Sequence, residues 1–126
     1  MSQFNFADLA AGNSKQLSVP ASRTSTVTGS AIDILPIRGK ALVVQDVGAV
    51  TGTTPTLNGK LQDSADGSTD WTDIAGAVFA EVTAANKVEC IPLNVDNCRR
   101  YVRWVGTLGG TTPNFTVGVT MHGFVT

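Results

Sequence analysis

Four aspartates lie close together in this 126-residue chain and are the first residues to consider as a metal site. Asp63, Asp66, Asp70 and Asp73 follow one another at intervals of three, four and three. An EF-hand calcium loop needs oxygen ligands at alternate positions and a closing glutamate, so this spacing does not fit. Asp66-Gly67 is instead a preferred pair for a type I′ turn. We therefore expect a hairpin without metal, in which Asp63 and Asp70 bond their own backbone.

The single histidine and the two cysteines offer little further chemistry. His122 has no nucleophile and no orienting carboxylate near it in the sequence, as a catalytic triad would need. Cys90 and Cys98 have no second histidine for a zinc site and are not a Cys-x-x-Cys pair. A disulfide could join them, but two buried, unpaired side chains are the favoured interpretation. The sequence therefore indicates no enzyme, no cofactor and no metal.

Arginines and aromatic residues alternate in one short segment. Arg99, Arg100, Tyr101 and Arg103 form the densest basic cluster, and Trp104 follows them. Such a cluster suits nucleic acid only with a basic surplus, and the whole chain has 9 basic against 10 acidic residues. We expect no nucleic-acid partner, and we expect the cluster to bind carboxylates on a protein partner.

The composition predicts the elements that must carry these residues. Valine, threonine and isoleucine number 15, 16 and 5, against 8 leucines and 2 glutamates, which favours strands over helices. From Thr24 onward, apolar residues alternate with polar ones between closely spaced turn residues. The strands expected from this pattern are 24–28, 31–35, 41–47, 56–63, 77–83, 87–93, 99–108 and 114–125. Together they predict an all-β, antiparallel, jelly-roll-like sandwich of about eight strands.

The last two expected strands each have an apolar face. One strand places Phe115, Val117, Val119, Met121 and Val125 on the same side. The strand before it places Val102, Trp104 and Leu108 opposite Tyr101, Arg103 and Thr107. We expect both apolar faces to belong to the core. No apolar run approaches the roughly 18 residues that cross a bilayer, so no membrane partner is expected.

One sequence pattern occurs twice. Residues 47–57, VGAVTGTTPTL, resemble residues 105–115, VGTLGGTTPNF. Proline fixes one backbone angle and glycine admits positive ones, so each Gly-Thr-Thr-Pro segment is interpreted as a hairpin loop between two strands. We expect the two loops to lie at the same end of the molecule. A phosphate-binding loop is not favoured, because a strand rather than a helix follows each copy.

The first 23 residues lack a sustained period and are interpreted as an extended N-terminal arm, with the sandwich domain at residues 24–126. The arm has neither the basic start nor the long apolar run of a secretory signal, so export is not expected. Its apolar residues Phe4, Phe6 and Leu9 need a cover. They pack either on their own domain or on a neighbouring subunit, and we expect them to contact a partner.

The stretch from Lys40 to Thr126 resembles small structural proteins encoded beside the capsid genes of tailed bacteriophages. The resemblance rests on the two Gly-Thr-Thr-Pro segments, on residues 61–74 (LQDSADGSTDWTDI) and on residues 98–105 (CRRYVRWV). It implies a capsid decoration, or cement, protein. Such a protein is made in the host cytoplasm, sits on the outside of the virion and binds the major capsid protein, commonly as a homotrimer that staples neighbouring capsomers.

Two other functions stay open from the sequence. A carbohydrate-binding or adhesion module of a phage tail or fibre would use an exposed aromatic platform, with Trp71, Tyr101 and Trp104 as candidates. A head-completion or tail-tube subunit would also be small and β-rich, but it would form rings of higher order.

Overall fold

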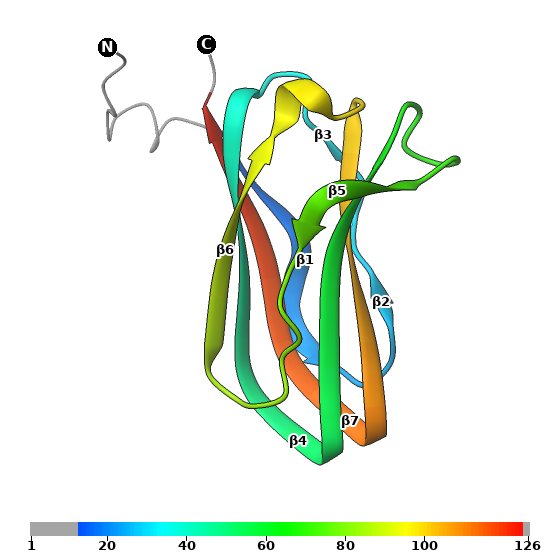
Figure 1. Cartoon of the computed structure of the whole chain (residues 1–126), viewed down its shortest axis with the longest axis vertical. Helices are drawn as coiled ribbons and strands as arrows, with labels where there is room; N and C mark the ends of the chain where they lie inside the picture. Colours follow the sequence, from blue (N-terminus) through cyan, green and yellow to red (C-terminus); the bar gives the residue numbers. More distant parts are fainter. Residues whose placement is uncertain (1–12, 125–126) are drawn as a thin grey trace.

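The computed structural model describes residues 13–124, which form seven strands and one 3₁₀ turn (Figure 1). All strand pairs are antiparallel, so the predicted all-β, antiparallel fold is confirmed. Within the described part there is no helix long and apolar enough to cross a membrane. The elements in chain order are β1 (Asn13–Arg23), β2 (Val27–Thr28), β3 (Ile32–Asp33), β4 (Arg38–Ser64), β5 (Thr72–Val78), β6 (Lys87–Asn94), η1 (Val95–Asn97) and β7 (Tyr101–Phe124).

Two long strands, β4 and β7, organise the sandwich because each takes part in both layers. The first half of β4 pairs with β6 and with the second half of β7, which in turn pairs with β1. The second half of β4 pairs with β5 and with the first half of β7, which also pairs with β2 and β3. We call these groups the first and the second layer. The four strands predicted at 41–47, 56–63, 99–108 and 114–125 are thus halves of two continuous strands.

The duplicated segments are the corners at which β4 and β7 pass from one layer to the other. Gly52 and Gly110 have φ angles of 117° and 99°, and Thr54 and Thr112 both have φ of 46°. The two corners pair with each other at the lower end in Figure 1, so the prediction that both copies share one end is confirmed. The prediction of hairpin loops was wrong, because neither strand returns to pair with itself among the described residues.

The core lies between the layers and uses most of the apolar faces expected from the alternation; Leu108 is only half-buried, and Val125 lies outside the described residues. Phe115, Val117, Val119 and Met121 are at most 1% exposed, and Val102 and Trp104 are fully buried. A polar contact also crosses this core: Trp104 Nε1 donates to Gln45 Oε1 over 3.1 Å. Gly59 makes room for the pair, since a Cβ at this position would overlap the Gln45 amide and the indole nitrogen.

The structure corrects the predicted boundary after residue 23. Residues 13–23 form β1, which pairs with β7 along most of its length. Leu17 of this strand is fully buried in the core. These residues therefore belong to the sandwich, whereas residues 1–12, with Phe4, Phe6 and Leu9, lie outside the described residues.

Candidate interaction surface

The predicted arginine cluster lies where η1 leads into β7, at the opposite end from the corners. Arg99 holds the loop between β4 and β5 in place. Its Nε donates to Asp63 Oδ1 over 3.0 Å, and its Nη2 donates to the carbonyls of Asp63 (2.6 Å) and Asp70 (2.7 Å). Nη2 also donates to the Thr72 hydroxyl over 2.9 Å. With four side-chain hydrogen bonds inside its own chain, Arg99 is a structural clamp, and its role in partner binding stays a prediction.

Arg100 is also engaged within the chain. Its guanidinium contacts the Asp33 carboxylate with Nη2 at 2.8 Å and Nε at 3.2 Å, and it lies 5.3 Å from the centre of the Tyr101 ring. This bond from Arg100, together with one from the Leu35 backbone N–H, lowers the pKa of Asp33. The prediction that Arg100 seeks a partner's carboxylate remains a prediction, and any such carboxylate would have to compete with Asp33.

Arg103 packs against Trp71, and Arg100 is the most exposed arginine of the cluster. The Arg103 guanidinium lies 4.2 Å from the centre of the Trp71 ring, and its Nε donates to Gln62 Oε1 over 2.9 Å. Both side chains are half-buried, and so is Tyr101, whose ring lies beside Gly67. Trp104 is fully buried, so the three-residue aromatic platform considered for glycans does not exist on this surface.

The loop between β4 and β5 is held by an aspartate, though not by the two that were predicted. Asp66 Oδ1 accepts from the backbone N–H groups of Ser68 (3.0 Å) and Thr69 (2.9 Å), and its Oδ2 accepts from the Thr69 hydroxyl (2.7 Å). These donors, with the Ser64 hydroxyl, hold the pKa of Asp66 far below its usual range. The expected two-residue turn was also wrong, because pairing between β4 and β5 stops at Asp63 and the loop is longer.

The four aspartates of this region do not converge on one point, because they bond to three different groups of partners. Asp63 binds Arg99, Asp66 caps the loop, the Asp70 carbonyl binds Arg99, and Asp73 accepts from Lys60 and Gln62. The bond from Gln62 and then that from Lys60 lower the pKa of Asp73. Residues 13–124 contain no group of three or more acidic, histidine or cysteine side chains placed to hold a metal.

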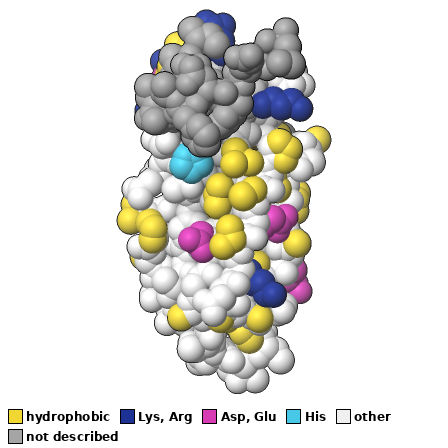
Figure 2. Space-filling model, turned by 90° about the vertical axis from the view of Figure 1, so that its left-hand side faces the viewer, with side chains coloured by type: hydrophobic (Ala, Val, Ile, Leu, Met, Phe, Trp, Pro, Cys, Tyr) yellow, Lys and Arg dark blue, Asp and Glu magenta, His cyan; other side chains and the backbone are white. Residues whose placement is uncertain are grey.

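The outer face of the first layer carries an apolar patch that the sequence analysis missed (Figure 2). Leu42 and Val88 are 44% and 64% exposed. Val44 is half-buried, and its cross-strand partner Cys90 and the nearby Pro92 are exposed. The alternation of β4 and β6 could have revealed this patch, because both faces of these strands contain apolar residues.

The two cysteines are free, and only one is partly buried. Cys90 is exposed, so the expectation of two buried thiols was wrong for this residue. Cys98 is half-buried, and burial with the nearby Asp63 charge raises its pKa to about 11. The exposed Cys90 thiol should therefore react faster than that of Cys98.

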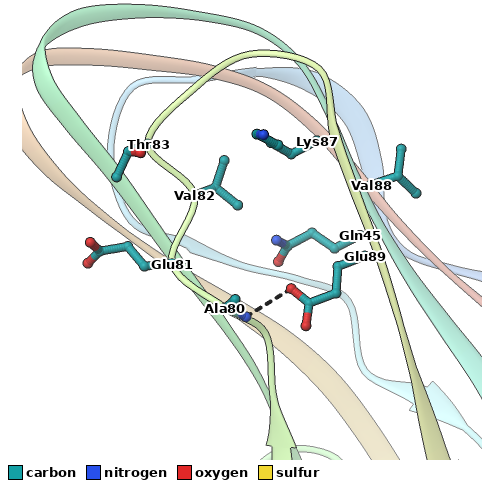
Figure 3. A pocket seen from close by; sticks show the side chains of 8 residues that line it. All are labelled: Gln45, Ala80, Glu81, Val82, Thr83, Lys87, Val88 and Glu89. Atoms are coloured by element: carbon teal, nitrogen blue, oxygen red, sulfur yellow. Dashed lines mark hydrogen bonds between the residues drawn. The ribbon is translucent and has the colours of Figure 1, made fainter.

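A cavity of about 410 Å³ opens between β6 and the segment after β5 (Figure 3). Glu89 crosses its mouth and accepts the Ala80 backbone N–H over 2.9 Å. Gln45 reaches it from the first half of β4, but its Nε2 is buried and has no hydrogen-bond partner. Gln45 thus lines the cavity, but its Nε2 is not accessible to solvent there.

No protein-family model matches the chain, and no curated protein matches it either.

Proposed function

We propose that this chain is a structural protein of a tailed-phage virion that binds the outer surface of the capsid and stabilises contacts between neighbouring capsomers. Its partners are the major capsid protein and further copies of itself. The observation that carries the proposal is the resemblance of residues 40–126 to small structural proteins encoded beside phage capsid genes. These residues include β5, β6, β7 and all of β4 except Arg38 and Gly39, and thus strands of both layers.

The geometry supports this role through the position of the resembling motifs. The two corners lie at one end of the long axis, and the Asp66 loop with the arginine cluster lies at the other. Because β4 and β7 run the full length, a force applied at either end is carried by continuous backbone and paired strands. A protein that staples a shell needs such a stiff body with contact groups on its surface.

Within the arginine cluster, Arg103 and Trp71 are the contact groups we favour. Arginine and tryptophan are common at the energetic centres of protein interfaces. Arg99 and Arg100, by contrast, are held by aspartates of their own chain. A carboxylate of the capsid protein could join Arg103 without breaking an internal ion pair.

The test is binding of the purified chain to empty tailed-phage capsids assembled without it. Saturable co-sedimentation is expected, with a trimer in analytical ultracentrifugation. Trp71→Ala with Arg103→Ala should weaken binding by about tenfold or more, whereas Leu35→Ser, at an exposed loop position, should not. A folded wild-type chain that does not co-sediment would contradict the proposal, and a stable hexameric ring would favour a connector or tail role instead.

A further inference from the structure

The apolar patch on the outer face of the first layer has a charged residue at each end of its central strand. Along β4, Lys40, Leu42, Val44 and Asp46 point outward, because the residues between them are buried. Apolar side chains occupy the middle of this face, and charged side chains lie around them (Figure 2). None of the ion pairs found within residues 13–124 includes Lys40 or Asp46. In the described part of the chain, both charges therefore lack a counterpart.

The order of these four residues is complementary to itself. Lys40 and Asp46 each lie three residues from Val43, which is about 10 Å along the strand. When a second copy of β4 is laid antiparallel over the first, with Val43 at the centre, Lys40 faces Asp46 of the second copy. Leu42 then faces Val44 of the second copy. Each contact occurs twice, as it does in every two-fold interface.

The neighbouring strand β6 fits the same arrangement. Its outward-facing residues are all uncharged and exposed, namely Val88, Cys90, Pro92 and Asn94. The antiparallel overlay places Cys90 over Pro92 of the second copy. In the same way, Val88 lies over Asn94. No charge on β6 therefore opposes this overlay.

The parallel overlay is disfavoured by the charges on β4. It would place Lys40 over Lys40 of the second copy, and Asp46 over Asp46. Like charges held against each other in an interface cost free energy, so they discriminate against this arrangement. The apolar centre favours association itself, because contact removes the exposed Leu42 and Val88 side chains from water.

We propose that two copies of this chain pair face to face through their first layers, about a two-fold axis that runs across β4 at the level of Val43. Ion pairs between Lys40 and Asp46 form the two ends of the contact, and the apolar patch forms its centre. The inference goes beyond capsid binding and does not depend on it. A two-fold contact joins copies in pairs, so a three-fold association on the capsid would use another surface.

Charge exchange tests the pairing. Sedimentation velocity over a range of concentrations measures the self-association of the full chain. Lys40→Asp and Asp46→Lys should each weaken this association at least about tenfold, since like charges then meet at both ends of the contact. An equimolar mixture of the two variants should regain it, because each acidic position of one chain then faces a basic position of the other.

The control is the double variant, Lys40→Asp with Asp46→Lys in one chain. It keeps the complementary order and the net charge, so it should associate like the wild type. Equal association of all these proteins, or a wild-type chain that does not self-associate, would overturn the proposal.

Cross-linking tests the register of the contact. In a Cys90→Ser, Cys98→Ser background, Lys40→Cys and Asp46→Cys are made as two separate single-cysteine chains. A bismaleimide that spans about 10 Å, the distance between stacked sheets, should join the two chains when they are mixed. Neither chain should link to itself, because equivalent positions lie about 20 Å apart in the pair. Self-linked product as abundant as the mixed product, or no product in the mixture, would overturn the proposal.

Discussion

The hydrogen bond between Gln45 and Trp104 joins side chains from facing layers inside the core. Gln45 is 1% exposed and Trp104 is fully buried. The Trp104 Nε1–H therefore depends on Gln45 Oε1 as its hydrogen-bond acceptor, and Gln45 Oε1 depends on Trp104 as its donor. The Gln45 Nε2 remains without a partner, which makes this pair costly to keep. Replacing both members with apolar groups of similar size should therefore destabilise the fold by less than the sum of the two single replacements.

A double-mutant cycle would measure this coupling. Trp104→Phe should lower the free energy of unfolding by about 2–4 kcal/mol, from lost packing and an unpaired amide oxygen, and Gln45→Met by about 1–2 kcal/mol. The double variant should lose at least about 1 kcal/mol less than the sum. Urea unfolding of the four proteins gives these values, and simple additivity would mean that the bond contributes little.

The Asp66 loop predicts a pH effect of definite sign. The folded-state pKa of Asp66 is lowered by the N–H groups of Thr69 and Ser68 and by two hydroxyls, so the carboxylate stabilises the fold above its unfolded pKa of about 4. This contribution decreases as the pH falls below that value. Asp66→Ala should thus be destabilised relative to wild type at pH 7, with a smaller gap at pH 2.5. Chemical unfolding at both pH values tests this, and a gap independent of pH would contradict it.

At the level of elements, the sequence predicted where strands lie better than where they begin and end. The halves of β4 and β7 were found by alternation, but their corners contain glycine and proline and so were interpreted as hairpin loops. β1 was missed because its alternation is broken by register shifts on either side of Ser18, which leave the adjacent Leu17 and Ser18 both buried. The local sequence pattern of β1 cannot show that this segment pairs with β7, which lies far away in the sequence.

The contacts of the arginine cluster could likewise be predicted only in part from the sequence. Its residues could be chosen from the sequence, since arginines and aromatics alternate there. Their partners could not: Arg99 bonds Asp63, 36 positions away, and Arg100 bonds Asp33, 67 positions away. Only the pairing of β7 with β4 and β3 brings these carboxylates close.

The two corners should respond alike to the same substitution, because each glycine lies against the other corner. A Cβ on Gly52 would meet the Thr112 carbonyl oxygen at 2.7 Å, and one on Gly110 would overlap the Thr54 carbonyl oxygen. Gly52→Ala and Gly110→Ala should each cost about 2–3 kcal/mol, from positive φ plus this clash. Gly76→Ala is the control, since Gly76 has φ of 78° and open space around it, and it should cost only about 1 kcal/mol. Thermal unfolding would show a clear difference between the two corners if they were not equivalent.

At the scale of the whole molecule, the layers share their two longest strands and should therefore unfold together. A sandwich made of two separate sheets could lose one layer and keep part of the other. Here loss of the first layer would remove half of β4 and half of β7, and with them the Gln45 side of the core that covers Trp104. Val43 and Val47 of the first layer pack in the same core as Leu57 and Leu61 of the second. Loss of either layer would therefore expose the apolar side chains of the other to water.

We accordingly expect one cooperative transition. Far-ultraviolet circular dichroism, which reports on both layers, and tryptophan fluorescence, which reports on Trp71 and Trp104 of the second layer, should give coincident urea curves. Hydrogen exchange should assign the same opening free energy to slow amides in both halves of β4. Lower protection confined to the first layer, or two separated transitions, would show that the corners act as hinges between independent sheets. A shared transition is also what the proposed stapling role requires, since a body that opened one layer at a time would yield at the corners before its contacts with the shell did.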